Sequence, residues 1–391
     1  MSHTLITNIG LLVTNNPLHD GTPLGLIADA AMVVSDGKIE WVGSRNDAPT
    51  KDIPTVIDAL GNCVIPGFVD THNHLVFAGD RAHEFSARMR GEKYQTGGIN
   101  YTMTQTRAAS DQVLRANVHY LVHQAMESGT TTLEIKSGYG LTVADERRSL
   151  EIASEFTPET TFLGAHIVPP EYVTAPDDYV SLITETMIDE VTRYAKWIDV
   201  FCDRGAFTPD QTRRVLQAGK SKGLLPRIHA NQLEQGEGIA VGVELDAASV
   251  DHVSHFNDRD IALLSTSNTV ATFLPGAEFS TRAKYPDVRP MFEAGVNVAL
   301  ATDCNPGSSY TNSMPFVIAL AVREFFFTPE QALWSATAGG AKALRRKDIG
   351  SLRVGASADF LILNAPSYIH FAYRPGVQLI EEVWRHGNRV N

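Results

Sequence analysis

Apolar and polar residues follow different patterns at the ends and in the middle of the chain. The short apolar runs 31–34 and 39–42 flank Asp36-Gly37, a dipeptide favoured in two-residue hairpin turns. The runs 360–363 and 380–384 are strand-like as well. Because short β segments cannot bury a face alone, we expect the two ends of the chain to pair in one small β-sandwich module.

Between residues 63 and 348, apolar runs alternate with segments of helical period, which is typical of βα units around a parallel sheet. Residues 112–128 carry apolar side chains on one helical face, and Gly129 ends that helix. Thr208 and Thr328 each precede a proline and have a glutamine three positions on, as at capped helix starts. Eight runs are expected as strands, namely 64–70, 131–136, 160–165, 197–201, 226–230, 247–251, 269–274 and 296–302.

Eight such units predict a closed (β/α)₈ TIM barrel. An open doubly wound sheet is the alternative, but a glycine-rich phosphate loop usually follows its first strand, and here that position holds His72-Asn73-His74. The expected domains are a β module formed by 1–62 and 349–391, and a barrel over 63–348. The stretch 78–104 reads as a loop that could cover a site.

Composition narrows the class of protein. Hydrophobic residues at 43% and charged residues at 20% are ordinary for a globular chain. The net charge of -12 argues against a nucleic-acid or anionic-membrane partner, since both favour clusters of Lys and Arg. No apolar run approaches the roughly 20 residues of a membrane helix, and no secretory leader is evident. Three cysteines, an odd number, suit reduced thiols, so we expect a cytoplasmic protein.

The histidine pair after the first expected strand carries the clearest chemical signal. Alternate residues of an extended strand share a face, so His72 and His74 project to the same side while Asn73 points away. Two imidazoles in that arrangement can hold one metal ion. The pair therefore predicts a metal site at the end of this strand.

Other polar residues follow later strands at equivalent positions. In a TIM barrel the active residues lie at the carboxyl ends of the strands. His166 follows the third expected strand, His252 the sixth and Asp303 the eighth, and His229 lies at the end of the fifth. We therefore expect these side chains to meet at one rim. His119 and His123, four apart on an expected outer helix, are expected to be solvated instead.

The pattern of His-x-His on strand one, His on strands five and six and Asp on strand eight resembles the amidohydrolase superfamily over essentially the whole chain. The segments 66–81, 136–141, 274–277 and 302–307 are similar, more narrowly, to the members that open 4-imidazolone-5-propanoate in histidine degradation. The resemblance implies a hydrolase that converts this small molecule to N-formimidoyl-L-glutamate.

The resemblance also implies a single zinc or iron ion. Its ligands would be His72, His74, His229 and Asp303. Three neutral imidazoles and one carboxylate leave a position for water, whose pKa the metal lowers. Metal-bound hydroxide would attack the ring carbonyl, with Asp303 taking the water's proton and His252 orienting the water. Relatives with two metals carry a lysine at the end of strand four, where this chain reads Phe201-Cys202-Asp203.

The propionate tail of such a substrate needs a cationic partner, and Arg81 is the candidate because its guanidinium can bind a carboxylate through two hydrogen bonds. By resemblance, further contacts with the substrate would come from Tyr139, His166, Asn305, Gly307 and Ser308. Gln232 stands where some members of the family carry a carboxylate. It cannot act as a general base, so we expect it to bind the ring.

Two other functions stay open at this point. A deaminase of a cyclic amidine or aromatic amine would use the same mononuclear site, but a neutral base would not need Arg81. A barrel without catalysis, kept as a binding or scaffold protein, would not need to hold about one equivalent of metal. A homodimer is possible on the prevalence of two-fold symmetric enzymes.

Overall fold

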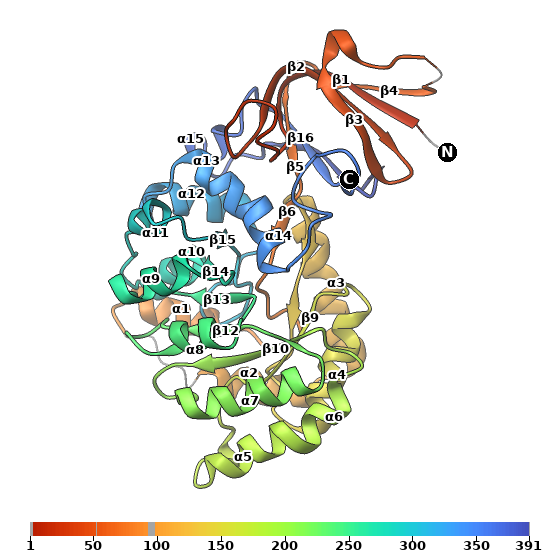
Figure 1. Ribbon diagram of the computed structural model, residues 1–391. Helices are drawn as coiled ribbons and strands as arrows, with labels where there is room; N and C mark the ends of the chain where they lie inside the picture. The colour runs from red at the N-terminus through yellow and green to blue at the C-terminus, as the bar shows by residue number, and fades with distance from the viewer. Residues whose placement is uncertain (1–2, 52, 93–97, 391) are drawn as a thin grey trace. The chain divides into compact units, whose positions relative to one another are not determined.

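The computed structural model describes residues 3–51, 53–92 and 98–390 (Figure 1). Contacts between Cα atoms divide the chain into two compact units. The first unit comprises residues 1–70, 124–132 and 313–391, and the second comprises 71–123 and 133–312. Both units are therefore assembled from segments far apart in the sequence.

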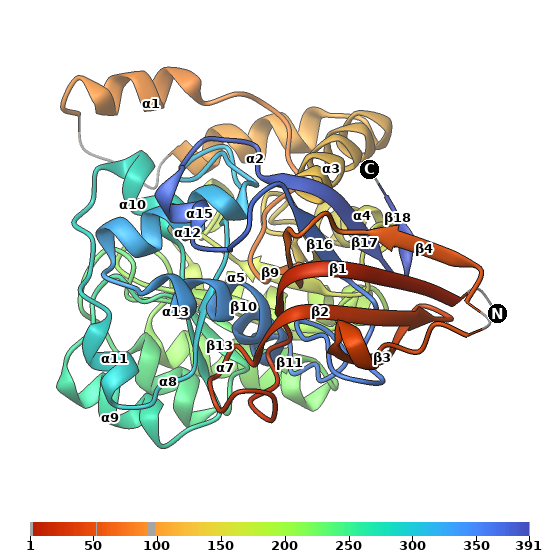
Figure 2. The same ribbon diagram turned by 90° about the horizontal axis from the view of Figure 1, so that it is seen from above.

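The first unit contains a mixed β-sheet built from both ends of the chain (Figure 2). Its order is β18-β17-β16-β5-β1-β2-β3, with β4 pairing parallel to β1. The strands are β1 (His3–Val13), β2 (Leu26–Ser35), β3 (Lys38–Ser44), β4 (Thr55–Asp58), β5 (Cys63–Pro66), β16 (Phe360–Leu363), β17 (Ile380–Arg385) and β18 (Asn388–Arg389). Antiparallel pairing of β5 with β16 joins the two ends of the chain in one sheet.

The turn between β2 and β3 shows why the sequence folds this way locally. Ser35 pairs with Lys38, which leaves Asp36-Gly37 as the two turn residues. Both have positive φ, at 48° and 76°, as the turns that match strand twist require. The hairpin expected at Asp36-Gly37 is therefore confirmed.

The same unit also holds a short strand pair and a set of helices. The pair is β6 (Phe68–Asp70) with β7 (Thr130–Leu133). The helices are α12 (Met314–Glu324), α13 (Pro329–Trp334), α14 (Gly340–Ala343) and α15 (His370–Tyr373), with a π-helical turn at Ser335–Gly339 and a 3₁₀ turn at Arg45–Asp47. Thr328 caps α13 in the capping box that the sequence predicts.

The second unit is built on a parallel sheet in the order β15-β14-β13-β12-β10-β9-β8. Its strands are β8 (Ile135–Lys136), β9 (Thr160–Ala165), β10 (Trp197–Cys202), β12 (Ile228–Ala230), β13 (Ser249–His252), β14 (Val270–Phe273) and β15 (Val298–Leu300), with β11 (Leu225–Pro226) beside β10. Nearly every residue of these strands is buried, as expected of parallel strands covered by helices.

Helices alternate with these strands and pack along them, as α4, α7 and α8 do (Figure 1). The helices are α1 (Ala82–Met89), α2 (Ile99–Ala108), α3 (Asp111–Glu127), α4 (Val143–Ser154), α5 (Pro176–Leu182), α6 (Ile188–Val191), α7 (Pro209–Ser221), α8 (Gly238–Glu244), α9 (Asp258–Ser265), α10 (Pro275–Thr281) and α11 (Arg289–Glu293). Shorter turns lie at Pro170–Tyr172 and Ile183–Met187. Thr208 caps α7 through the predicted capping box.

Backbone hydrogen bonds connect the two edges of this sheet through the segment that carries the histidine pair. The amide of His74 donates to the carbonyl of Cys304, and the amide of Asp303 donates to the carbonyl of His72. On the other side, the amide of Lys136 donates to the carbonyl of Asn73. Residues 72–74 thus lie between β8 and the segment after β15, and the α/β unit is TIM-barrel-like.

Two local expectations need correction. The run 64–70 forms two strands, because Gly67 separates β5, which joins the terminal sheet, from β6. The stretch 78–104 is not one loop, since α1 and the first half of α2 lie within it and residues 93–97 fall outside the described residues. Within the described residues, no helix has both the length and the hydropathy needed to cross a membrane.

We expect Gly67→Ala to destabilise the protein. A Cβ atom at this position would overlap the side chain of Thr131, and the backbone is held because the Gly67 amide donates to Asp359 at 2.9 Å. Overpacking of this kind costs about 1–3 kcal/mol of unfolding free energy, measurable by denaturant titration. Adding Thr131→Ala should recover part of the loss because it removes the nearest atoms; purely additive losses would contradict the packing explanation.

Candidate metal centre

Four side chains converge at the carboxyl ends of the strands in the second unit. His72 and His74 follow β6, His229 lies within β12, and Asp303 follows β15. All four are buried, with exposed fractions of 3% or less. The Nε2 atom of His74 lies 3.2 Å from Nε2 of His72 and 3.3 Å from Nε2 of His229. Asp303 Oδ1 lies 3.6 Å from the Nε2 atoms of both His72 and His74.

Two of these imidazoles form hydrogen bonds to carboxylates through Nδ1, the ring nitrogen that faces away from the centre. His72 Nδ1 lies 2.8 Å from Asp251 Oδ2, and His229 Nδ1 lies 3.0 Å from Asp199. An ionised carboxylate only accepts hydrogen bonds, so each Nδ1 carries the proton and each Nε2 presents a lone pair to the common centre. The hydrogen bonds therefore fix both the orientation and the tautomer of the two rings.

Buried cations stabilise these carboxylates in turn. Lys136 Nζ lies 2.9 Å from both Glu134 and Asp199, and 3.9 Å from Asp251. Arg227 Nη2 lies 3.3 Å from Asp251. All five side chains are completely shielded from solvent.

The network of buried charges keeps Asp199 ionised, as its pKa shows. Burial alone would raise it, but neighbouring His229 and Lys136 hold the pKa well below its ordinary value. The carboxylate therefore stays ionised in the interior. The cluster has one more carboxylate than cations, so its excess charge is negative.

The donor set fits a divalent metal ion. Ligand atoms at 2.0–2.2 Å from a tetrahedral ion are about 3.3–3.6 Å apart, close to the spacing of these nitrogen and oxygen atoms. The pKa values of His72 and His74 lie well below the ordinary value, first through burial and then through neighbouring charged side chains. Neutral imidazoles are the form that binds a metal.

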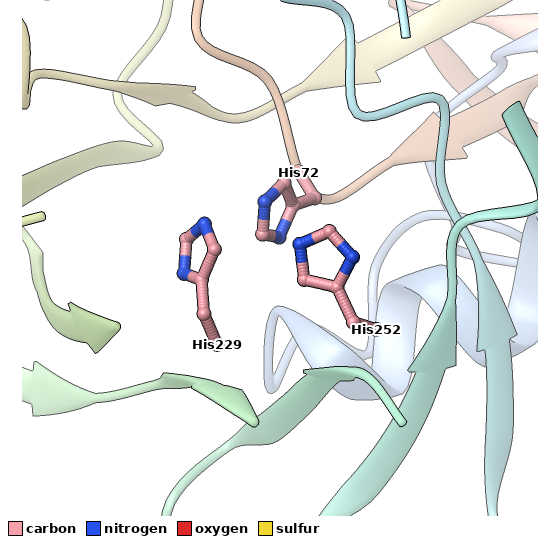
Figure 3. Close-up of side chains that lie close together, drawn as sticks. All are labelled: His72, His229 and His252. Carbon is pink, nitrogen blue, oxygen red and sulfur yellow. The ribbon is translucent and has the colours of Figure 1, made fainter. Parts of the chain in front are cut away.

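His252 joins this group from the end of β13. Figure 3 shows its ring turned toward those of His72 and His229, and one ring nitrogen of each lies within 4.8 Å of the others. Burial, followed by the nearby His229, lowers the pKa of His252 well below the ordinary value. Its Nδ1 atom is buried and bonds to no protein atom among the described residues. The neutral ring can therefore both accept and donate a hydrogen bond.

Left-handed backbone accompanies this geometry. His252 has a φ of 75° and Asp303 a φ of 53°. Such conformations in residues other than glycine cost of order 1–3 kcal/mol and persist where the surrounding structure enforces them. Two of the strand ends that face the centre therefore carry backbone strain.

A cavity lies over this centre. Among the expected site residues, those lining it are His74, Arg81, Tyr139, His166, Gln232, His229, His252, Asp303, Asn305 and Ser308. Ile99 and Phe201 also line it and were not anticipated, since single apolar residues give no signal in the sequence. The structure thus brings the expected residues to one site.

Arg81 is buried at 2% exposure but is not free within this cavity. Its Nε and Nη2 atoms donate to the carboxylate of Glu84 at 2.9 and 2.7 Å. A Cβ atom at position 307 would overlap its Nη1, so Gly307 leaves room for that side of the guanidinium. The Glu84 pair, which the sequence analysis did not anticipate, fixes the orientation of Arg81.

The segment after β15 is held mainly by its own hydrogen bonds. Asn305 Oδ1 accepts from the amides of Gly307 and Ser308, both at 2.8 Å, and its Nδ2 donates to the carbonyl of Asp303 at 2.6 Å. Ser308 Oγ donates to Asp303 Oδ2 at 3.2 Å. Asn305 and Ser308 therefore orient Asp303 besides lining the cavity.

The aromatic rings of His166 and Tyr139 form part of the cavity wall. The His166 ring stacks on His74 at 5.2 Å between centroids, and Tyr139 lies 5.4 Å from His166. Burial, together with His229, lowers the pKa of His166 to about 3, while Gly138 accepts its Nδ1 hydrogen bond at 2.9 Å. His166 is therefore neutral. His119 and His123 are exposed on α3, as expected of solvated side chains.

The carboxylates that accept hydrogen bonds from His72 and His229 are not among the residues predicted from the sequence. Asp199 stands in the apolar strand β10 and Asp251 directly precedes His252 in β13. An acidic residue inside a buried strand is the signal that could have revealed both, because such a charge needs a partner.

Comparison with known proteins gives one family match and many full-length relatives. Residues 63–390 match the amidohydrolase family. The chain is 60% identical over 390 residues to an imidazolonepropionase of Mycolicibacterium smegmatis, covering all of this chain and 98% of that protein. It is 58% identical to an imidazolonepropionase of Streptomyces griseus, with complete coverage of both.

Solved structures share the fold at low identity. A guanine deaminase from C. acetobutylicum superimposes with a TM-score of 0.74 at 18% identity, covering all of both chains. A zinc complex of an atrazine chlorohydrolase mutant from Arthrobacter aurescens has a TM-score of 0.74 at 15% identity, covering 99% of this chain and 94% of that one. These similarities bear on the fold alone.

Asp251→Asn should weaken metal binding. The variant removes the charge that accepts the His72 proton, and changes to such partners typically cost about 10–100-fold in metal affinity. Competition with a chromogenic chelator would measure the loss, and thermal unfolding would establish that the variant is folded. Asp210→Asn, at an exposed carboxylate, is the matched control. Unchanged metal affinity in folded Asp251→Asn would contradict this role.

Proposed function

Because this chain belongs to the imidazolonepropionase family of amidohydrolases, we propose that it hydrolyses 4-imidazolone-5-propanoate to N-formimidoyl-L-glutamate. The observation that carries the proposal is the cavity in which the converging donors and the Arg81 guanidinium lie together. A metal centre suits the ring carbonyl, and a buried cation suits the propionate tail.

The metal ligands we propose are His72, His74, His229 and Asp303, holding one zinc or iron ion per chain. A bound ion supplies Lewis-acid activation of water and of the ring carbonyl. The ligand spacing and the neutral state of the imidazoles support this assignment. Asp199 and Asp251 hold His229 and His72 in the required tautomer.

Asp303 transfers the proton in the proposed reaction, and His252 donates a hydrogen bond. Asp303 is placed to take a proton from the attacking water, and neutral His252 donates a hydrogen bond to the oxygen on which negative charge develops. The water oxygen bonds to the ring carbonyl carbon, the carbon–nitrogen bond breaks, and the departing nitrogen takes the proton from Asp303. Asp303 thereby returns to the carboxylate form.

The substrate contacts we propose surround this centre. Arg81 binds the propionate, and Glu84 fixes the orientation of its guanidinium. Gln232 binds the ring with its amide and plays no part as a base. The remaining contacts are Tyr139, His166, Asn305, Gly307 and Ser308, of which all but Gly307 line the cavity.

A deaminase is the other candidate for such a site. A deaminase of a neutral base has no use for the buried guanidinium of Arg81. In addition, the two imidazolonepropionases that are 60% and 58% identical to this chain align with it over nearly their full lengths. Both observations favour hydrolysis of a cyclic amide.

We also propose domains at 1–62 with 349–391 and at 63–348, with the terminal segments forming a sandwich. The pairing of β5 with β16 supports a shared terminal module. A homodimer and a cytoplasmic location remain predictions from the sequence.

An ultraviolet assay that follows loss of 4-imidazolone-5-propanoate tests the function. Turnover should fall at least about 10²-fold on chelation and return on addition of zinc or iron. His229→Ala should lose activity to a similar extent because it removes a ligand. His123→Ala, at an exposed histidine of α3, is the control and should stay active. Unchanged turnover in His229→Ala would refute the site.

Arg81→Ala tests recognition of the propionate. KM for the substrate should rise roughly 10–100-fold, because a charge-assisted contact is worth about 1.5–3 kcal/mol. A tail-less imidazolone should bind the variant and the unmodified enzyme almost equally. Arg90→Ala removes an exposed arginine at the end of α1 and should leave KM unchanged. Equal losses of affinity for the substrate and for the tail-less imidazolone in Arg81→Ala would contradict the role of Arg81 in binding the propionate.

A further inference from the structure

A second cavity shares a lining residue with the one over the proposed metal centre. That residue is Gln232, which lines both cavities. The second cavity is also lined by Ser254, His255 and Lys284, and by Glu278 from the first turn of α10. Glu278 belongs to none of the groups used so far.

Glu278 is an unusual carboxylate in this position. It is 2% exposed, and its Oε1 atom accepts a hydrogen bond from Ser254 Oγ. Its Oε2 atom is buried and accepts no hydrogen bond from the residues that the structure describes. Burial raises the pKa of Glu278 to about 7. A carboxylate in this state needs a donor or a cation to be stable in the ionised form.

The charged groups around Glu278 do not supply that cation. Asp303, after β15, is no such partner: its pKa is raised well above the ordinary value, first by burial and in smaller part by the like charge of Glu278. Lys284 and His255 line the same cavity from exposed positions, and neither contributes to the pKa shift of Glu278. Arg88 of α1 reaches α10 but donates to the carbonyl of Ser280 at 3.1 Å. Among the residues that the structure describes, the Oε2 atom of Glu278 therefore has no hydrogen-bond donor, and no cation contributes to the pKa of Glu278.

The proposed reaction produces a cation beside Gln232. Opening the ring converts its C–N=C–N unit to an amidine, and amidines are strong enough bases to be protonated at neutral pH. A formamidinium ion is planar and presents two N–H groups side by side, the arrangement that a carboxylate binds through paired hydrogen bonds. The ring itself is neutral, so only the product carries this group.

We propose that Glu278 and the cavity it lines form a subsite for the formamidinium end of the product. The inference rests on the proposed function, which supplies the cation. The amidinium would pass Gln232 and pair with Glu278, while Ser254 holds the other carboxylate oxygen. Because only the ionised carboxylate attracts a cation, product binding should strengthen as pH rises through the pKa of Glu278.

Calorimetry on the metal-loaded protein tests this without turnover. The probes are N-formimidoyl-L-glutamate and N-formyl-L-glutamate, which keeps both carboxylates but replaces the cation with a neutral formyl group. Between about pH 6 and pH 8, affinity for the formimidoyl compound should rise about tenfold more than that for the formyl compound, following ionisation of a group with a pKa of about 7.

Glu278→Gln keeps the size of the side chain and an oxygen for Ser254. It should lose about tenfold in affinity for the formimidoyl compound at about pH 8, lose the extra pH response, and leave the formyl compound unaffected. Glu293→Gln, at an exposed residue of α11, is the matched control. Retained affinity and pH response in Glu278→Gln would overturn the subsite.

The pH comparison in the unmodified protein decides the question even where the variant does not fold: equal pH responses for the two probes would overturn the subsite. Formamidinium chloride, as a third probe, separates the two proposals. Binding of this ion that depends on Glu278, in a protein without turnover of the imidazolone, would refute the function and support the subsite.

Discussion

Two hydrogen bonds inside the barrel-like unit determine the rest of the site: His72 Nδ1 to Asp251 and His229 Nδ1 to Asp199. An imidazole can offer a lone pair at Nε2 only when Nδ1 holds the proton, and the two carboxylates impose that state on both rings. The third ring, His74, then completes a set of nitrogen atoms spaced 3.2–3.3 Å apart. Without the carboxylates, the same rings could bond to one another and close the centre.

An ionised carboxylate is unstable in the interior of a protein unless a cation or hydrogen-bond donors compensate its charge. The buried cations Lys136 and Arg227 supply this compensation. Removing one partner of a buried ion pair costs about 3–5 kcal/mol, so Lys136 and Arg227 are tied to the acids they face. Thr161 donates to Glu134, and Glu134 also accepts from the amide of Asn73 at 3.1 Å. The network thus extends to the backbone between His72 and His74, two of the proposed metal ligands. Its excess negative charge is suited to a cation at the centre.

The sequence predicts those features that depend on periodicity or turn chemistry. Each of the eight apolar runs overlaps at least one strand, and the Asp36-Gly37 hairpin and the capped starts of α7 and α13 follow from local residue types. It could not predict that Gly67 divides one run between two sheets, because the pairing of β5 with β16 joins residues nearly 300 positions apart.

The same distinction applies to the site. Strand ends indicate which residues face the rim, so the expected side chains could be named from their positions. Their partners depend on tertiary contacts. Glu84 pairs with Arg81 only because α1 begins there, and Glu278 is an unremarkable acid until α10 buries it. Sequence reasoning therefore finds residues placed by a strand, and misses those whose chemistry arises from burial.

The proton balance of the proposed reaction explains why Gln232 needs no acid–base function beside the ring, and why an ionisable residue such as Glu278 can be useful near it. Both protons of the water end on the nitrogen side of the broken bond, one on the departing nitrogen and one on the amidine, and the new acid group ionises. No proton needs to be exchanged with solvent, so a wall residue without acid–base capacity, such as Gln232, is sufficient beside the ring. What changes during the reaction is the distribution of charge, since a neutral ring becomes a carboxylate and an amidinium. Asp303 and the metal position face the first of these groups, and an ionisable Glu278 beyond Gln232 faces the second.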